Sequence, residues 1–217
     1  MECGVIPYAS WTGTYRNLDA LRKAGWHLLT GPHIMWGHGW KAPLWTDKTV
    51  APHALDNGAW SAYQKQEPFN GPAFERALDV AGHSADWIVV PDIVAGGRKS
   101  LEFSLSWLER MKQFKLNLLA VQDGMEPCDV QPHLSNRVGI FVGGTTEWKL
   151  DTMCRWGELA RDVGCYLHIG RVNSCRRIRL CQKVGAHSFD GTSATRFAST
   201  IPRLDNARRQ KTIWELV

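Results

Sequence analysis

Three aspartates are the side chains of this sequence that are best placed for chemistry. Asp56, Asp92 and Asp190 each end a short apolar run, and a turn or a helical pattern follows each of them. Carboxylates at the carboxyl ends of strands are frequent catalytic groups in α/β folds. Each aspartate alone also suits a turn or a helix cap, but the same arrangement at three strand ends favours a shared site.

Paired carboxylates suit substitution at the anomeric carbon of a sugar. One carboxylate can attack the carbon while another transfers protons. Further apolar runs end in an amide, Gln122, and in two glycines, Gly143 and Gly144. Carboxylates and amides hydrogen-bond the N–H and amino groups of a planar heterocycle, and glycine lets the ring approach the backbone. The sequence therefore predicts a cup for a small polar heterocycle.

Histidine and lysine bear on the same question. His168 lies in an apolar run and is expected to be a hydrogen-bonded residue of the barrel interior rather than a ligand. A barrel aldolase or decarboxylase would normally carry a lysine at a strand end. No predicted interior strand ends in a lysine, which argues against that class of enzyme.

The elements that must position these residues alternate along the chain. Apolar runs bounded by turn residues predict strands at 4–8, 27–30, 53–56, 87–91, 117–122, 138–143, 166–170 and 187–190. Amphipathic patterns predict helices at 18–24, 72–81, 101–114, 149–163, 175–184 and 194–209. This alternation indicates a parallel sheet covered by helices. Eight candidate strands favour a closed, compact (β/α)8 barrel, with an open doubly wound sheet as the alternative.

Composition sets the broad class of the protein. The 217 residues are 44% hydrophobic and 22% charged, which suits one soluble domain spanning 1–217. Neither a membrane-spanning run nor a signal peptide is apparent, so a cytoplasmic location without a membrane partner is expected. The six cysteines form no Cys-x-x-Cys pair, so neither a zinc subdomain nor another metal site is expected.

Two stretches suggest contacts with a substrate. Residues 31–52 are rich in glycine, proline and tryptophan, and such a long irregular loop is expected to face the substrate. The net charge of +5 fits simple solubility or a polyanionic partner equally well. Four arginines are candidates for nucleic-acid phosphate contacts, namely Arg171, Arg176, Arg177 and Arg196.

Several motifs taken together resemble the tRNA-guanine transglycosylase superfamily, in order and over most of the chain. They are Asp56-Asn57-Gly58-Ala59-Trp60, Val90-Pro91-Asp92, Ala120-Val121-Gln122, Val142-Gly143-Gly144 and Phe189-Asp190-Gly191-Thr192-Ser193-Ala194-Thr195-Arg196. The resemblance implies a (β/α)8 barrel that exchanges guanine for a 7-deazaguanine, such as a queuosine precursor, without a cofactor. It implies that Asp190 is the nucleophile and that Asp56 transfers protons. Base-binding roles fall on Asp92, Gln122, Gly143 and Gly144.

The departures from the family pattern point to DNA. The tRNA enzymes carry a Cys-x-Cys-x-x-Cys…His zinc subdomain, which this sequence lacks. The usual Ser-Gly-Gly after the first aspartate is Asn57-Gly58-Ala59, and the usual proline before Thr195-Arg196 is Ala194. The chain is more similar to compact relatives encoded by bacteriophages and genomic islands, which insert 7-deazaguanines into DNA.

The resulting hypothesis is base exchange through a covalent glycosyl-aspartate. The target nucleotide must leave the base stack, and Trp60 is expected to stack on it or on its neighbour. The alternatives are a nucleoside or deazapurine glycosylase that uses water, a tRNA-directed exchange, and a non-catalytic barrel that binds nucleic acid. A homodimer or a partner protein is compatible with so short a barrel.

Overall fold

The apolar runs form parallel strands that close into a barrel. The computed structural model describes residues 4–10, 15–32 and 52–210. The strands are β1 (Ile6–Ser10), β2 (His27–Thr30), β3 (His53–Leu55), β4 (Ile88–Val89), β5 (Asn117–Val121), β6 (Val138–Val142), β7 (Leu167–Ile169) and β8 (Ser188–Gly191). They pair in chain order, and β8 pairs with β1 to complete the ring. The (β/α)8 prediction is confirmed, and the doubly wound alternative is wrong.

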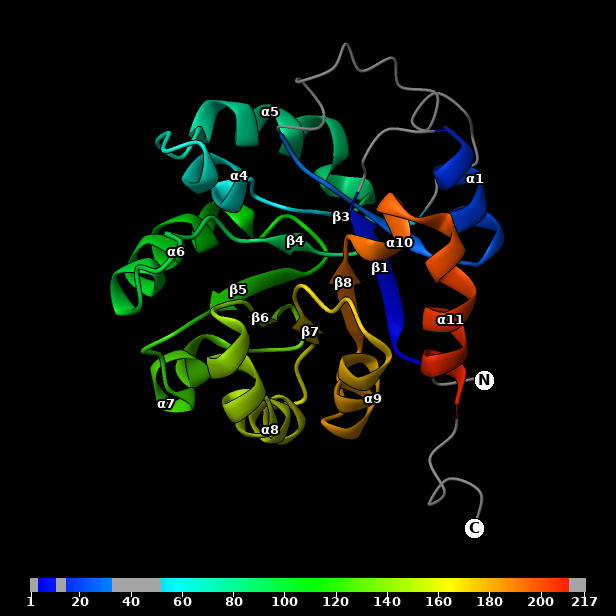
Figure 1. The fold of residues 1–217 in the computed structure, drawn as a ribbon. Helices are drawn as coiled ribbons and strands as arrows, with labels where there is room; N and C mark the ends of the chain where they lie inside the picture. Colours follow the sequence, from blue (N-terminus) through cyan, green and yellow to red (C-terminus); the bar gives the residue numbers. More distant parts are fainter. Residues whose placement is uncertain (1–3, 11–14, 33–51, 211–217) are drawn as a thin grey trace.

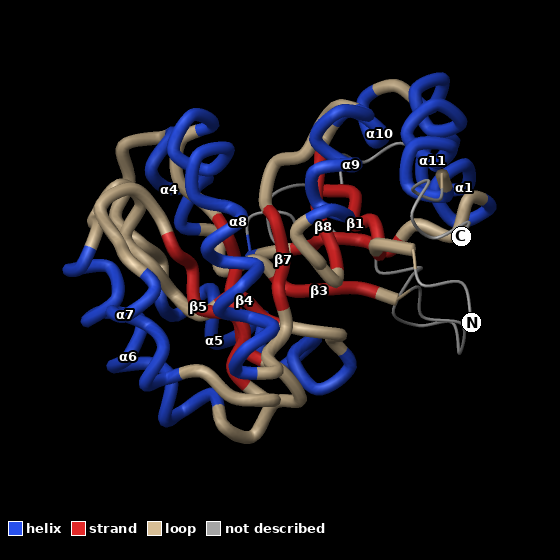
Figure 2. Tube along the Cα trace, turned by 90° about the horizontal axis from the view of Figure 1, so that it is seen from below, coloured by secondary structure: helices blue, strands red, loops and turns tan. Residues whose placement is uncertain are grey.

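Helices surround the strands on the outside (Figures 1 and 2). They are α1 (Tyr15–Lys23), α4 (Ala59–Gln64), α5 (Gly71–Ala81), α6 (Arg98–Met111), α7 (Pro127–Val130), α8 (Thr146–Val163), α9 (Cys175–Lys183), α10 (Ser193–Arg196) and α11 (Ile201–Arg209). In both views α1, α9 and α11 cover one side of the barrel, and α6 and α7 cover the other.

The helix predicted at 194–209 is broken in the structure. After α10 the backbone of Phe197 is extended, with φ −137° and ψ 93°, and a short 3-10 turn at Ala198–Thr200 precedes α11. Pro202 lies in the first turn of α11, the place where a missing N–H costs a helix least. The proline therefore starts a new helix instead of continuing the old one.

Two apolar layers hold the barrel together. One layer fills the inside of the ring with Tyr8, Leu29, Ala54, Trp87, Val89, Leu118 and Ala120. The other packs outward-facing strand residues, among them Leu55, Ile88 and Phe189, against the helices. Successive strand residues point to opposite faces, so each strand supplies both layers.

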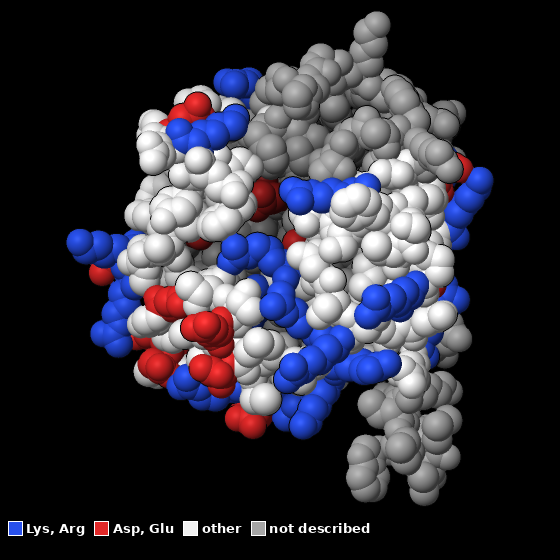
Figure 3. Space-filling view, viewed as in Figure 1, with Lys and Arg blue, Asp and Glu red and all other residues white. Residues whose placement is uncertain are grey.

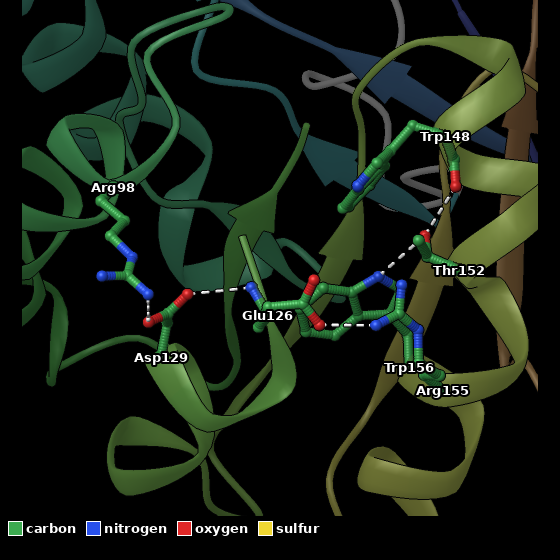
Figure 4. Close-up of polar contacts among 7 residues, drawn as sticks. All are labelled: Arg98, Glu126, Asp129, Trp148, Thr152, Arg155 and Trp156. Carbon is green, nitrogen blue, oxygen red and sulfur yellow. Dashed lines mark hydrogen bonds and ion pairs between the residues drawn. The ribbon is translucent and has the colours of Figure 1, made fainter. Parts of the chain in front are cut away.

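Polar contacts fix the helices α6, α7 and α8 relative to one another (Figure 4). Nη2 of Arg98 in α6 lies 3.1 Å from Oδ1 of Asp129 in α7. Oε2 of Glu126, the residue that caps α7, lies 2.6 Å from Nη1 of Arg155 in α8. Among the described residues, no helix offers an apolar stretch long enough to cross a bilayer.

Candidate active site

The three aspartates predicted from the sequence meet at the mouth formed by the carboxyl ends of the strands. Asp56 follows β3, Asp92 lies shortly after β4, and Asp190 is within β8. Burial and then the charges of Asp92 and Asp190 raise the pKa of Asp56 to about 7. The negative charges of both other carboxylates therefore disfavour ionisation of Asp56.

The turn after β3 is built around Asn57. Its Nδ2 donates to Val90 O at 2.9 Å and to Asp92 Oδ1 at 2.8 Å, and its Oδ1 accepts from the backbone N–H of Ala59 at 2.8 Å. This one buried side chain therefore ties the β3 turn to the β4 loop and orients Asp92. Burial raises the pKa of Asp92 to about 6, against the opposing effect of the Asn57 hydrogen bond.

Asp190 is held from one side. Its side chain is buried, and its Oδ1 accepts hydrogen bonds from His168 Nε2 at 3.0 Å and from the backbone N–H of Arg171 at 3.1 Å. Within the described residues no hydrogen bond reaches Oδ2 of Asp190. One carboxylate oxygen is thus anchored by two donors, whereas the other makes no hydrogen bond in the described part of the chain.

His168 lies inside the barrel, as expected, but it also belongs to the site. It is fully buried, and its Nδ1 lies 2.7 Å from Ser188 Oγ. Burial lowers the pKa of His168 although the hydrogen bond and the charge of Asp190 oppose the shift, which favours the neutral form of the ring. The contact with Asp190 could not be predicted from the sequence, because it depends on the register that sets His168 beside Ser188.

Arg171 spans the rim of the mouth. Its backbone is left-handed, with φ 58°, and its guanidinium donates to Gly144 O. The Cζ atom lies 4.6 Å from the ring centroid of Trp60, and Trp60 also stacks on Tyr63 with centroids 5.8 Å apart. The predicted residues Arg171, Gly144 and Trp60 are therefore neighbours.

The remaining predicted base-binding residues lie just after their strands, with Gln122 following β5 and Gly143 and Gly144 following β6. Gln122 is buried, and its Nε2 donates to Ile93 O at 2.9 Å, in the loop that also carries Asp92. The Gly143 N–H donates to Val121 O at 2.8 Å. The backbone of Gly144 has φ +68°, and a Cβ there would lie 2.6 Å from Asp123 Oδ2. Both glycines thus occupy places where backbone is closely surrounded.

The other arginines lie beyond the rim. Arg176 is exposed and Arg177 half-buried in the first turn of α9, which Ser174 caps, and exposed Arg196 ends α10. Figure 3 shows acidic atoms inside a hollow of this face, with basic side chains beside the hollow and over α9. An anionic chain following this basic surface would pass the mouth.

Lys149 is a buried residue that the sequence did not single out. It comes from α8, is 7% exposed, and its Nζ donates to Gly170 O at the end of β7. Burial, followed by the charge of Arg171, lowers its pKa to about 8. The cavity that it lines with Arg171 and Arg177 measures about 10 Å³, room for no more than a water molecule. Lys149 therefore supports the β7 end rather than a substrate.

A larger cavity of about 660 Å³ lies beside the turn after β3. Asn57 and Gly58 form one wall, and residues of α4 and α5 with Phe69 form others. In the part of the chain that the structure describes, no group of three or more His, Cys, Asp or Glu side chains is placed to hold a metal ion. Most of the predicted loop 31–52, including Trp36, Trp40 and Trp45, lies outside the described residues.

Comparison with known proteins supports the fold. No protein-family model and no curated protein sequence matches the chain. Among solved structures, an HpcH/HpaI aldolase from Desulfitobacterium hafniense DCB-2 is similar, with a TM-score of 0.56, 10% identity, and coverage of 96% of this chain and 94% of that one. An aldolase named QR15 has a TM-score of 0.56 and 12% identity, with coverage of 93% and 96%.

A third similar structure is the tryptophan synthase A-subunit from Pyrococcus furiosus. Its TM-score is 0.52 and its identity 16%, with coverage of 95% of this chain and 96% of that one. At such low identity these likenesses show the barrel fold alone. The chemistry must therefore be inferred from the residues at the mouth.

Proposed function

We propose that this protein exchanges guanine in a nucleic acid for a 7-deazaguanine base, with DNA as the preferred substrate. The observation that carries the proposal is the environment of Asp56. Burial, and then the charges of Asp92 and Asp190, raise its pKa to about 7, which lets the same group give and take a proton near neutral pH. Asp190, anchored through Oδ1 alone, supplies the nucleophile that such an exchange requires.

The first half of the reaction forms a covalent intermediate. Oδ2 of Asp190 attacks C1′ of the flipped guanosine, and the bond between C1′ and N9 breaks. The electron pair of that bond goes to the leaving guanine, which takes a proton from the protonated carboxyl of Asp56. The sugar is then held as an ester of Asp190.

The second half reverses these roles. A 7-deazaguanine enters, the Asp56 carboxylate accepts its N9 proton, and N9 attacks C1′. The ester bond to Asp190 breaks, and Asp190 leaves as a carboxylate. Two displacements at the same carbon retain its configuration, and neither the backbone of the nucleic acid nor a cofactor takes part.

The remaining residues read and hold the substrate. Asp92, Gln122 and the backbone of Gly143 and Gly144 would hydrogen-bond the edge of the base. Trp60 would stack on the flipped base or its neighbour. Arg171, Arg176, Arg177 and Arg196 would contact flanking phosphates, and these contacts weaken as salt rises.

The test is mass spectrometry of nucleosides from DNA, and separately from tRNA, after incubation with the protein and a 7-deazaguanine. We expect the modified nucleoside in DNA together with released guanine. Asp190→Asn should abolish both products and the trapped protein–DNA adduct while binding stays measurable. Free guanine without incorporation would indicate a hydrolase, incorporation only into tRNA would change the substrate, and unchanged incorporation by Asp190→Asn would overturn the nucleophile.

A further inference from the structure

The interior of the barrel contains a serine, a histidine and an aspartate in hydrogen-bonded sequence. Ser188 Oγ lies 2.7 Å from His168 Nδ1, and His168 Nε2 lies 3.0 Å from Asp190 Oδ1. Such a set can activate a serine nucleophile when the hydroxyl faces a substrate. Here Ser188 and His168 are both fully buried, so no substrate can reach the hydroxyl. Of the three residues, only Asp190 lies at the mouth of the barrel. Any effect of Ser188 and His168 on the reaction must therefore pass through Asp190.

We propose that Ser188 and His168 are positioning residues that fix the orientation of Asp190 for nucleophilic attack. This inference rests on the function proposed above. In this arrangement Ser188 holds the imidazole, and the imidazole holds Oδ1 of Asp190, so that Oδ2 faces the substrate.

The direction of each hydrogen bond follows from the groups present. A carboxylate oxygen can only accept, so Nε2 of His168 must carry a proton toward Asp190. In a neutral ring with its proton on Nε2, Nδ1 has no proton and accepts from the hydroxyl of Ser188. Ser188 has a second polar neighbour, the half-buried Tyr166, whose pKa is raised by burial while the hydrogen bond to Ser188 opposes the shift. The serine therefore sets the tautomer that Asp190 needs.

Aromatic packing holds the ring of His168 in this position. The ring stacks on Phe141 with centroids 4.8 Å apart and a 23° interplanar angle. Trp87 packs against it at 4.4 Å between centroids, and Tyr8 contacts its edge at 6.0 Å. The charged groups that act on the ring are Asp190 of β8 and Lys149 of α8. An aromatic cage of this kind would accept phenylalanine in place of histidine.

The test compares variants that separate packing from hydrogen bonding. His168→Phe keeps a flat ring in the cage and removes the donor, and we expect kcat for base exchange to fall at least about 100-fold. His168→Gln restores an N–H donor and should recover about ten-fold of that loss. Ser188→Ala should lower kcat by about ten-fold with KM for the base unchanged. The acidic limb of the pH profile of kcat should move to higher pH in His168→Phe, because a donor to the Asp190 carboxylate is lost. It should stay in place in His168→Gln.

Thr152→Val is the matched control. Thr152 is another buried hydroxyl, which donates to Trp148 O at 2.8 Å and accepts from Trp156 Nε1 at 3.2 Å on α8 (Figure 4). This variant should keep kcat within about two-fold. A His168→Phe variant that folds and keeps the wild-type kcat and pH profile would overturn the positioning role.

A second measurement does not depend on activity or on any variant. Nitrogen-15 NMR of the wild-type protein should show His168 as the neutral Nε2–H tautomer. Finding the proton on Nδ1, or on both nitrogens at neutral pH, would overturn the proposal. If the wild type exchanges no base in either nucleic acid, the proposed function fails, and the tautomer still decides whether Ser188 and His168 hold Asp190 in the proposed way.

Discussion

The guanidinium of Arg171 lies over the indole ring of Trp60, with its Cζ atom 4.6 Å from the ring centroid. The backbone N–H of the same arginine donates to Asp190 Oδ1 at 3.1 Å. One residue therefore occupies a face of the aromatic platform and also supports the proposed nucleophile. A base that stacks on that face of Trp60 must displace the guanidinium, which would then be free to meet a phosphate.

The backbone of Arg171 gives a first prediction. Its φ of 58° is left-handed, a conformation that costs a residue with a side chain about 1 kcal/mol relative to glycine. Arg171→Ala and Arg171→Gly both lose the stacking and keep the N–H toward Asp190. We expect urea unfolding to show the glycine variant to be more stable than the alanine variant by about 1 kcal/mol. Equal stabilities would contradict the left-handed assignment.

Asp56 gives a prediction about pH. Its pKa in the folded protein, about 7, is above its ordinary value of 3.8, so between these pH values the folded state binds more protons than the unfolded state. The contribution of Asp56 to the free energy of unfolding is therefore greatest at low pH, and it is lost as pH rises from about 4 through 7. At about 1.36 kcal/mol per unit, ionised Asp56 costs about 2–4 kcal/mol at pH 8, allowing for partial solvent access.

Asp56→Asn cannot ionise, so it should be more stable than the wild type at pH 8 by about 2–4 kcal/mol, and inactive. The difference should shrink as pH falls toward 4. Urea unfolding at several pH values checks this, with exposed Asp151→Asn on α8 as the control expected to change stability little. A gain in stability that does not depend on pH would contradict the electrostatic cause.

The glycine pair at the β6 end gives a third prediction. A Cβ on Gly144 would lie 2.6 Å from Asp123 Oδ2 and 2.7 Å from the ring of Trp148. Asp123 cannot easily move, because it accepts hydrogen bonds from Thr145 N at 2.7 Å and Thr145 Oγ1 at 2.6 Å. Gly144→Ala should therefore lower the free energy of unfolding by about 2–4 kcal/mol and impair binding of the base.

Gly164 is the matched control for this change. It has a similar φ of +72° and open space around its Cα, so Gly164→Ala adds backbone strain without a clash. We expect a loss of about 1 kcal/mol and unaltered exchange activity. Equal losses in the two variants would show that the space around Gly144 is not restricted.

The basic start of α9 gives a fourth prediction. Arg176→Gln with Arg177→Gln should weaken DNA binding and flatten its salt dependence, since each lost phosphate contact removes about 0.7–0.9 from the slope of log K against log salt. Titrations at several salt concentrations measure this. Arg110→Gln is the control, because Arg110 pairs with Glu75 at 2.6 Å between α6 and α5. If the slope of log K against log salt is unchanged in the double variant, α9 does not contact the phosphates of DNA.

The strands could be predicted from sequence because their signal is local. Buried parallel strands appear as continuous apolar runs, and every predicted strand is present with ends within two residues of the prediction. The short helices α4 and α7 were not predicted. A helix of one or two turns has too few residues to show a period, and α4 follows its N-cap residue Gly58, whose left-handed φ of 83° belongs to the turn at Asn57.

The aspartates and glycines of the site were predictable for a related reason. They end strands, and closure of the barrel brings strand ends together whatever the sequence separation. The roles of His168 and Lys149 were not predictable. Each depends on a contact between elements, to Asp190 in one case and to Gly170 O in the other, and neither contact leaves a pattern in neighbouring residues.

The pairing of β8 with β1, the seam of the barrel, determines when the proposed active site can be completed. Tyr8 is in register with Asp190 across that seam, so the proposed nucleophile sits on the last strand to pair with the first. A nascent chain on the ribosome can form most of the proposed site early. Asp190 reaches its place only when β8 emerges and pairs with β1. The proposed catalytic site would thus be complete only after the ring closes, and fragments that end before β8 would lack the proposed nucleophile.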